Sequence, residues 1–171
     1  MYLASERLVY SKFRESEYAI YASWYTNAAV MKHITGKALT EQEARERFGK
    51  AMATNQEHPD MGFFAARLKA TNQFIGIAKL AYYQSEYIEV GYGFLPEYWG
   101  KGFATEMLTF LVDYSRHLPG GRDLIAIVDP KNTGSKKVLT NQGFVLYDSK
   151  PEDGRPTEYY KLSWVRYSGT D

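Results

Sequence analysis

The chain contains no cysteine, and this absence excludes disulfide bonds, thiolate metal sites and a cysteine nucleophile. Charge of one sign is not in excess either, because 21 basic and 20 acidic residues leave a formal net charge of +1. We therefore expect no global electrostatic attraction to nucleic acid or to an anionic membrane. No apolar run approaches the roughly 18 residues of a membrane span, and no cationic segment followed by an apolar run stands at the start. These absences predict a cytoplasmic protein that works without a membrane.

The length of 171 residues, 44% of them hydrophobic, supports one hydrophobic core but not two ordinary domains. We predict a single domain over residues 1–171, with a loose tail at about residues 167–171. The three histidines, His33, His58 and His117, have no partner four residues away and no neighbouring pair of carboxylates. Because metal sites need such groupings, we expect no bound metal.

Apolar periodicity and turn residues predict a mixed succession of strands and helices. Strands are expected at about 8–13, 62–68, 74–83, 87–95, 124–128, 144–147 and 157–162, and helices at about 16–25, 41–55, 102–116 and 133–142. Residues 24–34 are expected to be irregular, and Thr40 with Glu43 forms a capping box for the second helix. The apolar run 124–128 indicates a strand buried on both faces, parallel to 87–95 because a strand–helix–strand crossover joins the two.

The stretch from Tyr87 to Tyr114 dominates the interpretation. Its strand alternates between two faces, one of them apolar and formed by Ile88, Val90, Tyr92 and Phe94. The other face carries Glu89 and two glycines, Gly91 and Gly93, and is nearly bare. Glycines at this spacing suit a position that a ligand or another backbone approaches closely. Glu89 is therefore a carboxylate on an open face.

A glycine-rich turn, Trp99-Gly100-Lys101-Gly102, follows this strand and leads into an amphipathic helix. A helix that begins at about Gly102 presents unpaired N–H groups and the positive end of its dipole, and the glycines let an anion approach them. The turn therefore predicts a pyrophosphate site. It is not a Walker A loop, because the lysine stands between the glycines, and it lacks the third glycine of the dinucleotide fingerprint.

The same turn resembles motif A of the GNAT superfamily of N-acetyltransferases, whose signature is Gln/Arg-x-x-Gly-x-Gly/Ala. Gly102 and Ala104 fill the last two signature positions, while Trp99 stands where the general signature has glutamine or arginine. This version is similar to the RimJ/RimL group, which acetylates the N-termini of ribosomal proteins. A second segment, from Asn132 through Ser135 and Val138-Leu139 to Gly143-Phe144, resembles motif B.

The order of elements resembles that of the family over the whole chain. The resemblance implies an α/β (α+β) fold of the GNAT type. In it, a central mixed and mostly antiparallel sheet carries about four helices and a splayed pair of parallel strands. It also implies acetyl-CoA as cosubstrate. The backbone that would hold the pyrophosphate belongs to Gly100, Lys101, Gly102, Phe103, Ala104 and Thr105.

Other cofactor contacts follow from the same resemblance. Phe94 and Leu95 would bind the pantetheine arm as if it were a further strand. Asn132 would contact the cofactor, although its alternative role is that of a helix N-cap. Three further lysines either attract the 3′-phosphate of CoA or form a solvated face, namely Lys131, Lys136 and Lys137.

The catalytic residues do not follow directly from motif B, because Leu139 stands where the family often has a tyrosine acid. Ser135 is the nearest substitute, able to stabilise the leaving sulfur by a hydrogen bond. Glu89 is the candidate base, and its alternative role is to pair with a lysine on the next strand. Glu106, in the first helical turn, is expected to interact with the helix dipole rather than to catalyse. Candidate acceptor contacts are His33, Tyr82 and Tyr92, with Tyr25 and Tyr159 also near the groove.

The leading hypothesis is an enzyme that moves acetyl from acetyl-CoA to a primary amine by direct transfer. A protein N-terminal α-amine is favoured as acceptor by the resemblance alone. A small amine, such as a polyamine, an amino acid or an antibiotic, is the alternative. A CoA-binding module without catalysis is a further alternative, and a homodimer is left open.

Overall fold

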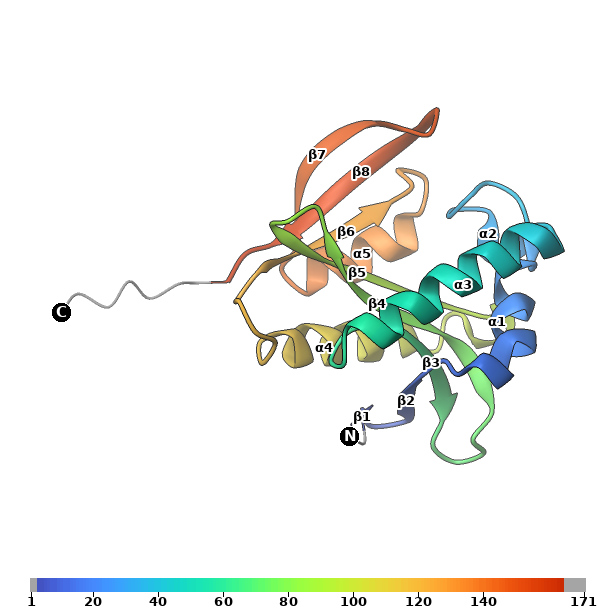
Figure 1. Ribbon diagram of the computed structural model, residues 1–171. Helices are drawn as coiled ribbons and strands as arrows, with labels where there is room; N and C mark the ends of the chain where they lie inside the picture. The colour runs from blue at the N-terminus through green and yellow to red at the C-terminus, as the bar shows by residue number, and fades with distance from the viewer. Residues whose placement is uncertain (1–2, 165–171) are drawn as a thin grey trace.

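The computed structural model describes residues 3–164. Eight strands in this part of the chain form one sheet. The strands are β1 (Leu3–Ala4), β2 (Leu8–Lys12), β3 (Gly62–Leu68), β4 (Phe74–Tyr83), β5 (Tyr87–Phe94), β6 (Asp123–Val128), β7 (Val145–Glu152) and β8 (Arg155–Leu162). Their order in the sheet is β1-β2-β3-β4-β5-β6-β8-β7 (Figure 1). Neighbours are antiparallel except β5 and β6, which run parallel. This confirms the predicted mixed sheet with a parallel pair. The tail predicted at 167–171 lies outside the described residues.

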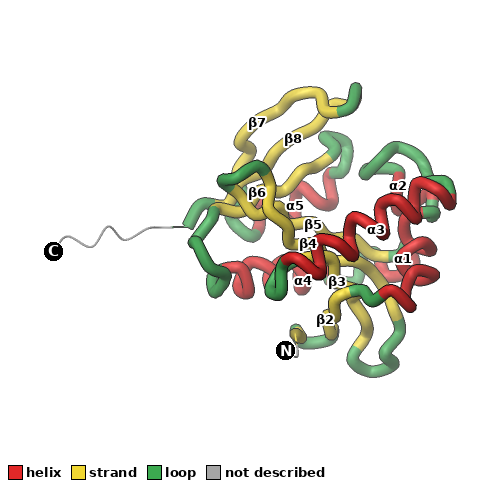
Figure 2. The backbone as a smooth tube through the Cα atoms, viewed as in Figure 1, coloured by secondary structure: helices red, strands yellow, loops and turns green. Residues whose placement is uncertain are grey.

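Five α-helices in the same residues cover the two faces of the sheet (Figures 1 and 2). They are α1 (Tyr18–Tyr25), α2 (Ala28–Met31), α3 (Glu41–Glu57), α4 (Phe103–Ser115) and α5 (Thr133–Asn141). Side chains of α1, α2 and α3 pack on one face in a cluster that includes Tyr21, Trp24 and Phe48. Side chains of α4 and α5 pack on the other face, against Ile88 and Val90. Two apolar layers thus enclose the sheet, and no helix in residues 3–164 is long and apolar enough to cross a membrane.

The predicted signals for the two longest helices are confirmed. Helix α3 begins with the capping box, in which the Thr40 hydroxyl accepts from the Glu43 N–H at 3.2 Å and the Glu43 carboxylate accepts from the Thr40 N–H at 2.8 Å. Helix α4 begins directly after Gly102, as the glycine turn predicted. On β5 the predicted apolar face is buried at Ile88, Val90 and Phe94.

Two local predictions were wrong. Residues 28–31 form α2 rather than irregular chain, because the Asn27 side chain caps this turn by accepting from the N–H groups of Ala29 and Val30. Strands were expected to end at about 147 and to begin again at about 157, yet β7 and β8 extend between these points to a two-residue turn at Asp153 and Gly154. Both turn residues have positive φ angles, 47° and 74°, which suit a tight hairpin.

Candidate active site

The central feature of the site is a gap in the sheet. The ladder between β5 and β6 ends at the pair Glu89–Ile125, after three residue pairs. Beyond it β5 continues along β4 to Phe94, while β6 continues along β8 to Val128. The two parallel strands therefore diverge, which is the predicted splayed pair.

Backbone groups of β5 face this gap at alternate residues. The Leu95 N–H donates to the Ile75 carbonyl of β4 at 2.8 Å, and the Leu95 carbonyl accepts from the Tyr98 N–H at 3.0 Å. Hydrogen-bonded and non-hydrogen-bonded pairs alternate along an antiparallel ladder, so the backbone groups of Phe94 and Tyr92 point away from β4 and toward the gap. The Phe94 N–H is thus oriented toward the gap, whereas the Phe94 carbonyl accepts from the Trp99 side chain and both backbone groups of Leu95 are engaged elsewhere.

The turn before α4 is left-handed at both of its glycines and leaves the start of the helix without a side-chain cap. Gly100 and Gly102 have φ angles of 71° and 79°, in the left-handed region that favours glycine. Gly102 is the N-cap of α4 and supplies no side-chain cap, so the N–H groups of the first turn are left for another acceptor. A Cβ at Gly100 would meet nothing within 4 Å, which shows that backbone conformation rather than crowding selects glycine there.

Arg7, in the loop between β1 and β2, supports this turn from outside. Its guanidinium donates to the Lys101 carbonyl at 2.9 Å and to the Glu106 carboxylate at 2.7 Å, and it lies 4.2 Å from the centroid of the Phe103 ring. Glu106 also accepts from the Ser5 hydroxyl at 2.6 Å. Burial alone would raise the pKa of Glu106, but the hydrogen bonds from Ser5 and Arg7 lower it. Glu106 is therefore an anchor for the chain around Arg7. Local sequence gave no sign of Arg7, because it is 94 residues from Lys101.

Trp99, the departure from the general motif, connects the turn to the end of β5. Its ring is half exposed, and its Nε1–H donates to the Phe94 carbonyl at 2.7 Å. The side chain thus supplies a hydrogen-bond donor at a position where the general signature has glutamine or arginine. Lys101 lies beside it, with its ammonium 5.5 Å from the centroid of the Tyr98 ring.

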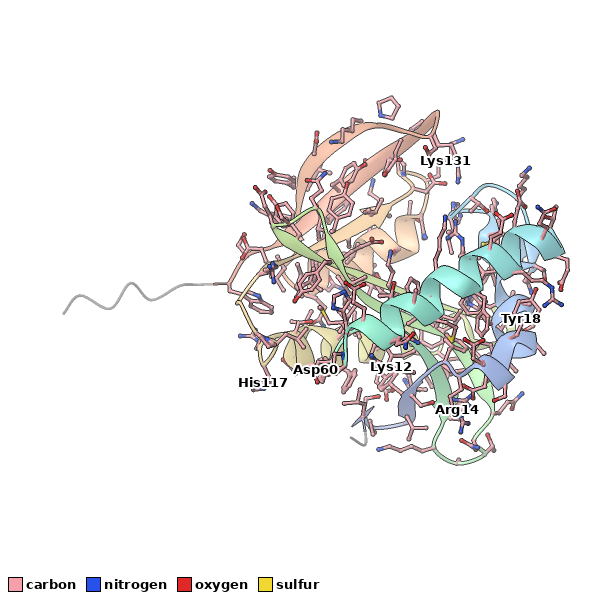
Figure 3. The ribbon with its side chains drawn as sticks, viewed as in Figure 1. Lys12, Arg14, Tyr18, Asp60, His117 and Lys131 are labelled. Carbon is pink, nitrogen blue, oxygen red and sulfur yellow. The ribbon has the colours of Figure 1, made fainter. Side chains whose placement is uncertain are left out.

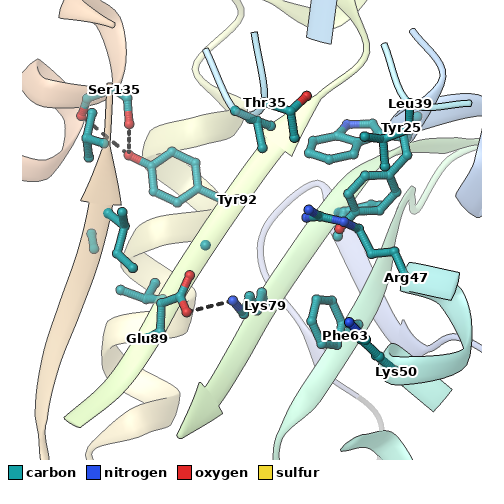
Figure 4. A pocket seen from close by; sticks show the side chains of 18 of the residues that line it. Tyr25, Thr35, Leu39, Arg47, Lys50, Phe63, Lys79, Glu89, Tyr92 and Ser135 are labelled. Atoms are coloured by element: carbon teal, nitrogen blue, oxygen red, sulfur yellow. Dashed lines mark hydrogen bonds and ion pairs between the residues drawn. The ribbon is translucent and has the colours of Figure 1, made fainter. Parts of the chain in front are cut away.

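A cavity of about 630 Å³ runs along the gap, from Ser135 of α5 to Arg47 and Lys50 of α3 (Figure 4). Glu89 and Tyr92 also line it, so the structure brings together three of the predicted site residues. Tyr82 does not line this cavity. Its ring instead lies under the Arg122 guanidinium, 4.4 Å from the ring centroid.

Glu89 forms an ion pair inside the cavity. Its Oε2 lies 2.6 Å from Nζ of Lys79 on β4, and the two side chains are only 18% and 26% exposed. Lys79 pairs with Gly91 across the ladder, so Glu89 is its diagonal neighbour. The alternative role foreseen for Glu89, a lysine partner on the next strand, is therefore present, and its role as a base stays a prediction.

The face that carries Glu89 is not bare. A Cβ added at Gly93 would lie 2.6 Å from Cζ2 of Trp24, a buried residue of α1. The close approach that the glycine spacing predicted is thus made by an indole ring. Only the part of the face around Glu89 and Gly91 opens into the cavity.

Ser135 is held by two neighbours in the first turn of α5. Asn132 Oδ1 accepts from the Ser135 N–H at 3.1 Å, so Asn132 is an N-cap, which was its alternative role. The Tyr92 hydroxyl lies 3.0 Å from Ser135 Oγ (Figure 4). Burial raises the pKa of Tyr92 to about 12, against a smaller lowering by the hydrogen bond to Ser135, so the phenol stays neutral. This contact between β5 and α5 was not predicted. Leu139, which stands where the family often has a tyrosine, is buried.

His33 lines a second cavity of about 450 Å³, which shares Arg47 and Glu89 with the first. Its Nδ1 lies 3.1 Å from Asp129 Oδ2. Arg155, at the start of β8, reaches the same oxygen at 3.4 Å and donates to the Ile34 carbonyl at 2.8 Å. These contacts join the hairpin to the loop after α2.

The predicted lysine cluster is only partly available to a ligand. Lys136 Nζ lies 3.0 Å from Glu158 Oε2, and the hydrogen bond to this carboxylate raises the pKa of Lys136. Lys131 and Lys137 are exposed. Figure 3 shows Lys131 near the tip of the β7–β8 hairpin and far from His117 at the end of α4. Residues 3–164 contain no group of three or more acidic or histidine side chains placed to hold a metal ion.

Comparison with known proteins gives a consistent result. The sequence model of the Acetyltransferase (GNAT) domain matches residues 7–145. The "uncharacterized N-acetyltransferase p20" of Bacillus licheniformis is 27% identical, over 98% of this chain and 98% of its own length.

Two solved structures show the same fold at lower identity. RimL, a ribosomal alpha-N-protein acetyltransferase in complex with coenzyme A, has a TM-score of 0.79 at 14% identity, covering 95% of this chain and 98% of that one. Spermidine N-acetyltransferase from Vibrio cholerae, in complex with CoA and spermine, has a TM-score of 0.72 at 18% identity, covering 91% and 93%. Since the family match extends from the loop that holds Arg7 to the start of β7, the chain belongs to the GNAT acetyltransferase family.

Proposed function

We propose that this enzyme transfers acetyl from acetyl-CoA to a primary amine directly, with a protein N-terminal α-amine as the favoured acceptor. The observation that carries the proposal is the end of the β5–β6 ladder at Glu89. It separates β5, which leads to the glycine turn, from β6 beside a cavity that holds a carboxylate. Acetyl-CoA would supply the activated acetyl thioester.

The residues present fit this cosubstrate. The uncapped N–H groups after Gly102 suit a pyrophosphate. The N–H of Phe94 and the backbone groups of Tyr92 suit an extended amide-bearing arm, while the Phe94 carbonyl is occupied by Trp99. The Asn132 oxygen is engaged by the helix, so the proposed cofactor contact falls to its amide nitrogen. The absence of cysteine supports transfer without a cysteine-bound acetyl intermediate.

In the proposed reaction a carbon–nitrogen bond forms as the carbon–sulfur bond breaks, and one proton moves in net terms from nitrogen to sulfur. Glu89 accepts the proton from the amine, directly or through water. The Lys79 ammonium beside it offsets the attraction of the Glu89 carboxylate for a charged ammonium, which makes the neutral amine easier to accommodate. An α-amine helps further, because its ordinary pKa of about 7.7–8 is well below the roughly 10.4 of a lysine-like amine.

The leaving sulfur would be met by Ser135. If the neutral Tyr92 phenol donates to Ser135 Oγ, the Ser135 proton is free to point at the sulfur. In this proposal Ser135 and Tyr92 together take the role of the tyrosine acid that the family often has at the position of Leu139. Ser135 then stabilises the sulfur by a hydrogen bond rather than by full proton transfer.

The acceptor proposal rests on likeness to RimL and to the RimJ/RimL form of the glycine turn. The likeness to a spermidine N-acetyltransferase keeps a small amine as the second candidate. Release of thiol from acetyl-CoA, measured with N-terminal peptides and small amines, decides between them. No release with any amine, while acetyl-CoA still binds, would leave a CoA-binding module.

The proposed pyrophosphate site is tested by measuring acetyl-CoA binding to the Gly102→Val variant by calorimetry. A bulky side chain at this left-handed position should abolish acetyl-CoA binding. Gly154→Val is the matched control, because Gly154 has φ 74°, a Cβ added there would meet nothing within 4 Å, and the residue lies in the β7–β8 turn. Unchanged acetyl-CoA affinity in a folded Gly102→Val protein would show that the pyrophosphate binds elsewhere.

A further inference from the structure

Arg47 is a cation that the reaction described above does not use. It lies on α3 and lines both cavities. Its guanidinium carbon lies 5.3 Å from the centroid of the buried Tyr25 ring. Figure 4 shows the side chain directed from α3 toward Tyr25, on the same side of the cavity as Lys50. An arginine held over an aromatic ring at a cavity wall is already oriented for a planar anion.

The charge of Arg47 is not balanced by an ion pair in the described part of the chain. No carboxylate in residues 3–164 forms an ion pair within 4.0 Å of its side-chain nitrogens, unlike those of Lys79, which pairs with Glu89. Two other carboxylates line the cavity from α3. Glu43 accepts from the Thr40 N–H, and Glu46 accepts from Gln42 at 3.1 Å.

Arg47 and Glu89 stand close to the same group. Burial raises the pKa of the Tyr25 hydroxyl; among smaller effects, Arg47 lowers it and Glu89 raises it. Arg47 and Glu89 also line both cavities together, so the two charges border the same open space. A small molecule with an amine at Glu89 could place an anionic group toward Arg47.

We infer that Arg47 binds an anionic group of the acceptor, and that the acceptor is an α-amine with a carboxylate within a few bonds. Two sources have this chemistry, a free amino acid and the acidic N-terminus of a peptide. Lys50 and Lys37 line the same cavity, as do Glu43 and Glu46, so the wall around Arg47 carries charges of both signs. The preference for an anionic group therefore rests on Arg47 itself, which forms no ion pair within residues 3–164. The inference rests on the proposed function and narrows its acceptor.

The test compares acceptors in pairs that share an amine. One pair is alanine and alaninamide, compared at a pH above both amine pKa values, and the other is a tripeptide amide beginning with aspartate and the same tripeptide amide beginning with asparagine. Spermidine is the cationic comparison. We expect kcat/KM from thiol release to be about 10- to 100-fold higher for the carboxylate member of a pair. If the free amino acid pair shows the larger ratio of kcat/KM values, the acceptor is a free amino acid. If the tripeptide pair does, the acceptor is the acidic N-terminus of a peptide.

Variants then assign the effect to one side chain. Arg47→Gln should raise KM for the carboxylate acceptor about 10-fold or more, with KM for its amide partner and for acetyl-CoA unchanged. Arg45→Gln is the control, because Arg45 lies on the same helix, is 65% exposed, pairs with Glu41 at 2.8 Å and lines neither cavity. Arg47→Lys should keep part of the preference, since it retains charge without the planar fork.

The outcomes separate the two proposals. Equal rates for acid and amide, a preference for spermidine, or an Arg47→Gln enzyme like the parent would overturn the role of Arg47 and leave acetyl transfer standing. No turnover with any amine would overturn the proposed function. In that case calorimetry of the carboxylate acceptors in the presence of CoA still decides on Arg47, because binding that is lost in Arg47→Gln supports the subsite and no binding to the parent refutes it.

Discussion

Replacing Glu89 and Lys79 singly and together distinguishes a base from a structural ion pair. Glu89→Gln keeps the shape of the side chain and removes the basic carboxylate. Lys79→Met keeps the length and removes the ammonium. The two groups are 2.6 Å apart, so they must be treated as coupled, and the double variant completes the cycle.

The stability effects of the two single changes should be alike. Each leaves one charge without its partner in a site where the side chains are 18% and 26% exposed. Partial solvent access limits the cost to about 1 kcal/mol, or a melting point lower by about 2–4 °C in a chain of this size. The double variant should lose no more, because it leaves no unpaired charge.

The effects on turnover should differ strongly if Glu89 is the base. We expect Glu89→Gln to lower turnover by roughly 10²–10⁴, whereas Lys79→Met should lower it by less than about 10-fold. Affinity for acetyl-CoA should change little in either, because Glu89 lies on the opposite face of β5 from Tyr92 and Phe94.

The assay is thiol release on one accepted amine across a range of pH, with melting points measured beside it. Equal losses of turnover in Glu89→Gln and Lys79→Met would make the carboxylate a partner for Lys79 only. Near-parental turnover of Glu89→Gln with an unchanged acidic limb would refute the base assignment outright. Water or another carboxylate would then take the proton.

Three further predictions concern residues around the gap. Asn132→Ala should cost about 1 kcal/mol through the lost N-cap and weaken acetyl-CoA binding by more; a lower melting point with intact calorimetric affinity would make Asn132 structural only. Gly93→Ala should destabilise by about 1–3 kcal/mol in thermal denaturation because its Cβ would lie 2.6 Å from Trp24, and a control Gly91→Ala variant that melts equally early would contradict this reason. Glu106→Gln should lower the free energy of unfolding at pH 7 by about 1–2 kcal/mol. Burial raises the pKa of Glu106, but the hydrogen bonds from Ser5 and Arg7 outweigh it and hold the folded-state pKa below the unfolded value. The stability that the carboxylate contributes is therefore lost as the pH falls through the folded-state pKa. An equal difference in unfolding free energy between parent and variant at pH 7 and at pH 3 would contradict this.

Much of the fold around the candidate site could be predicted because its signals are local in sequence. The strand alternation at 88–94, the glycine turn and the capping box at Thr40 each lie within about ten residues, and the structure confirms all three. The parallel pairing of β5 with β6 followed from one crossover. Chain geometry alone was sufficient for these elements.

The features that were missed depend on contacts between distant segments. Arg7 reaches Lys101 across 94 residues, and the indole of Trp24 covers Gly93. The Tyr92 hydroxyl meets Ser135 only because the sheet brings β5 beside α5. Periodicity reports which face a side chain is on, but not which residue from elsewhere packs there. The two strands of the hairpin were predicted too short. Proline cannot donate to a ladder, yet Pro151 and Pro156 face each other close to the turn within β7 and β8.

The three residue pairs between β5 and β6 are the only ladder that joins β1–β5 to β6–β8 within residues 3–164. A joint this narrow is expected to open at a lower free energy than the continuous ladders beside it, so the two blocks should behave as separate cooperative units in amide hydrogen exchange. A ligand that lies in the gap and bonds to β5 holds the blocks together as well as reacting. At about a hundred times its Kd such a ligand raises the free energy of unfolding by about 2.7 kcal/mol. Acetyl-CoA bound in the gap as proposed would therefore stabilise the folded chain as well as supply the acetyl group.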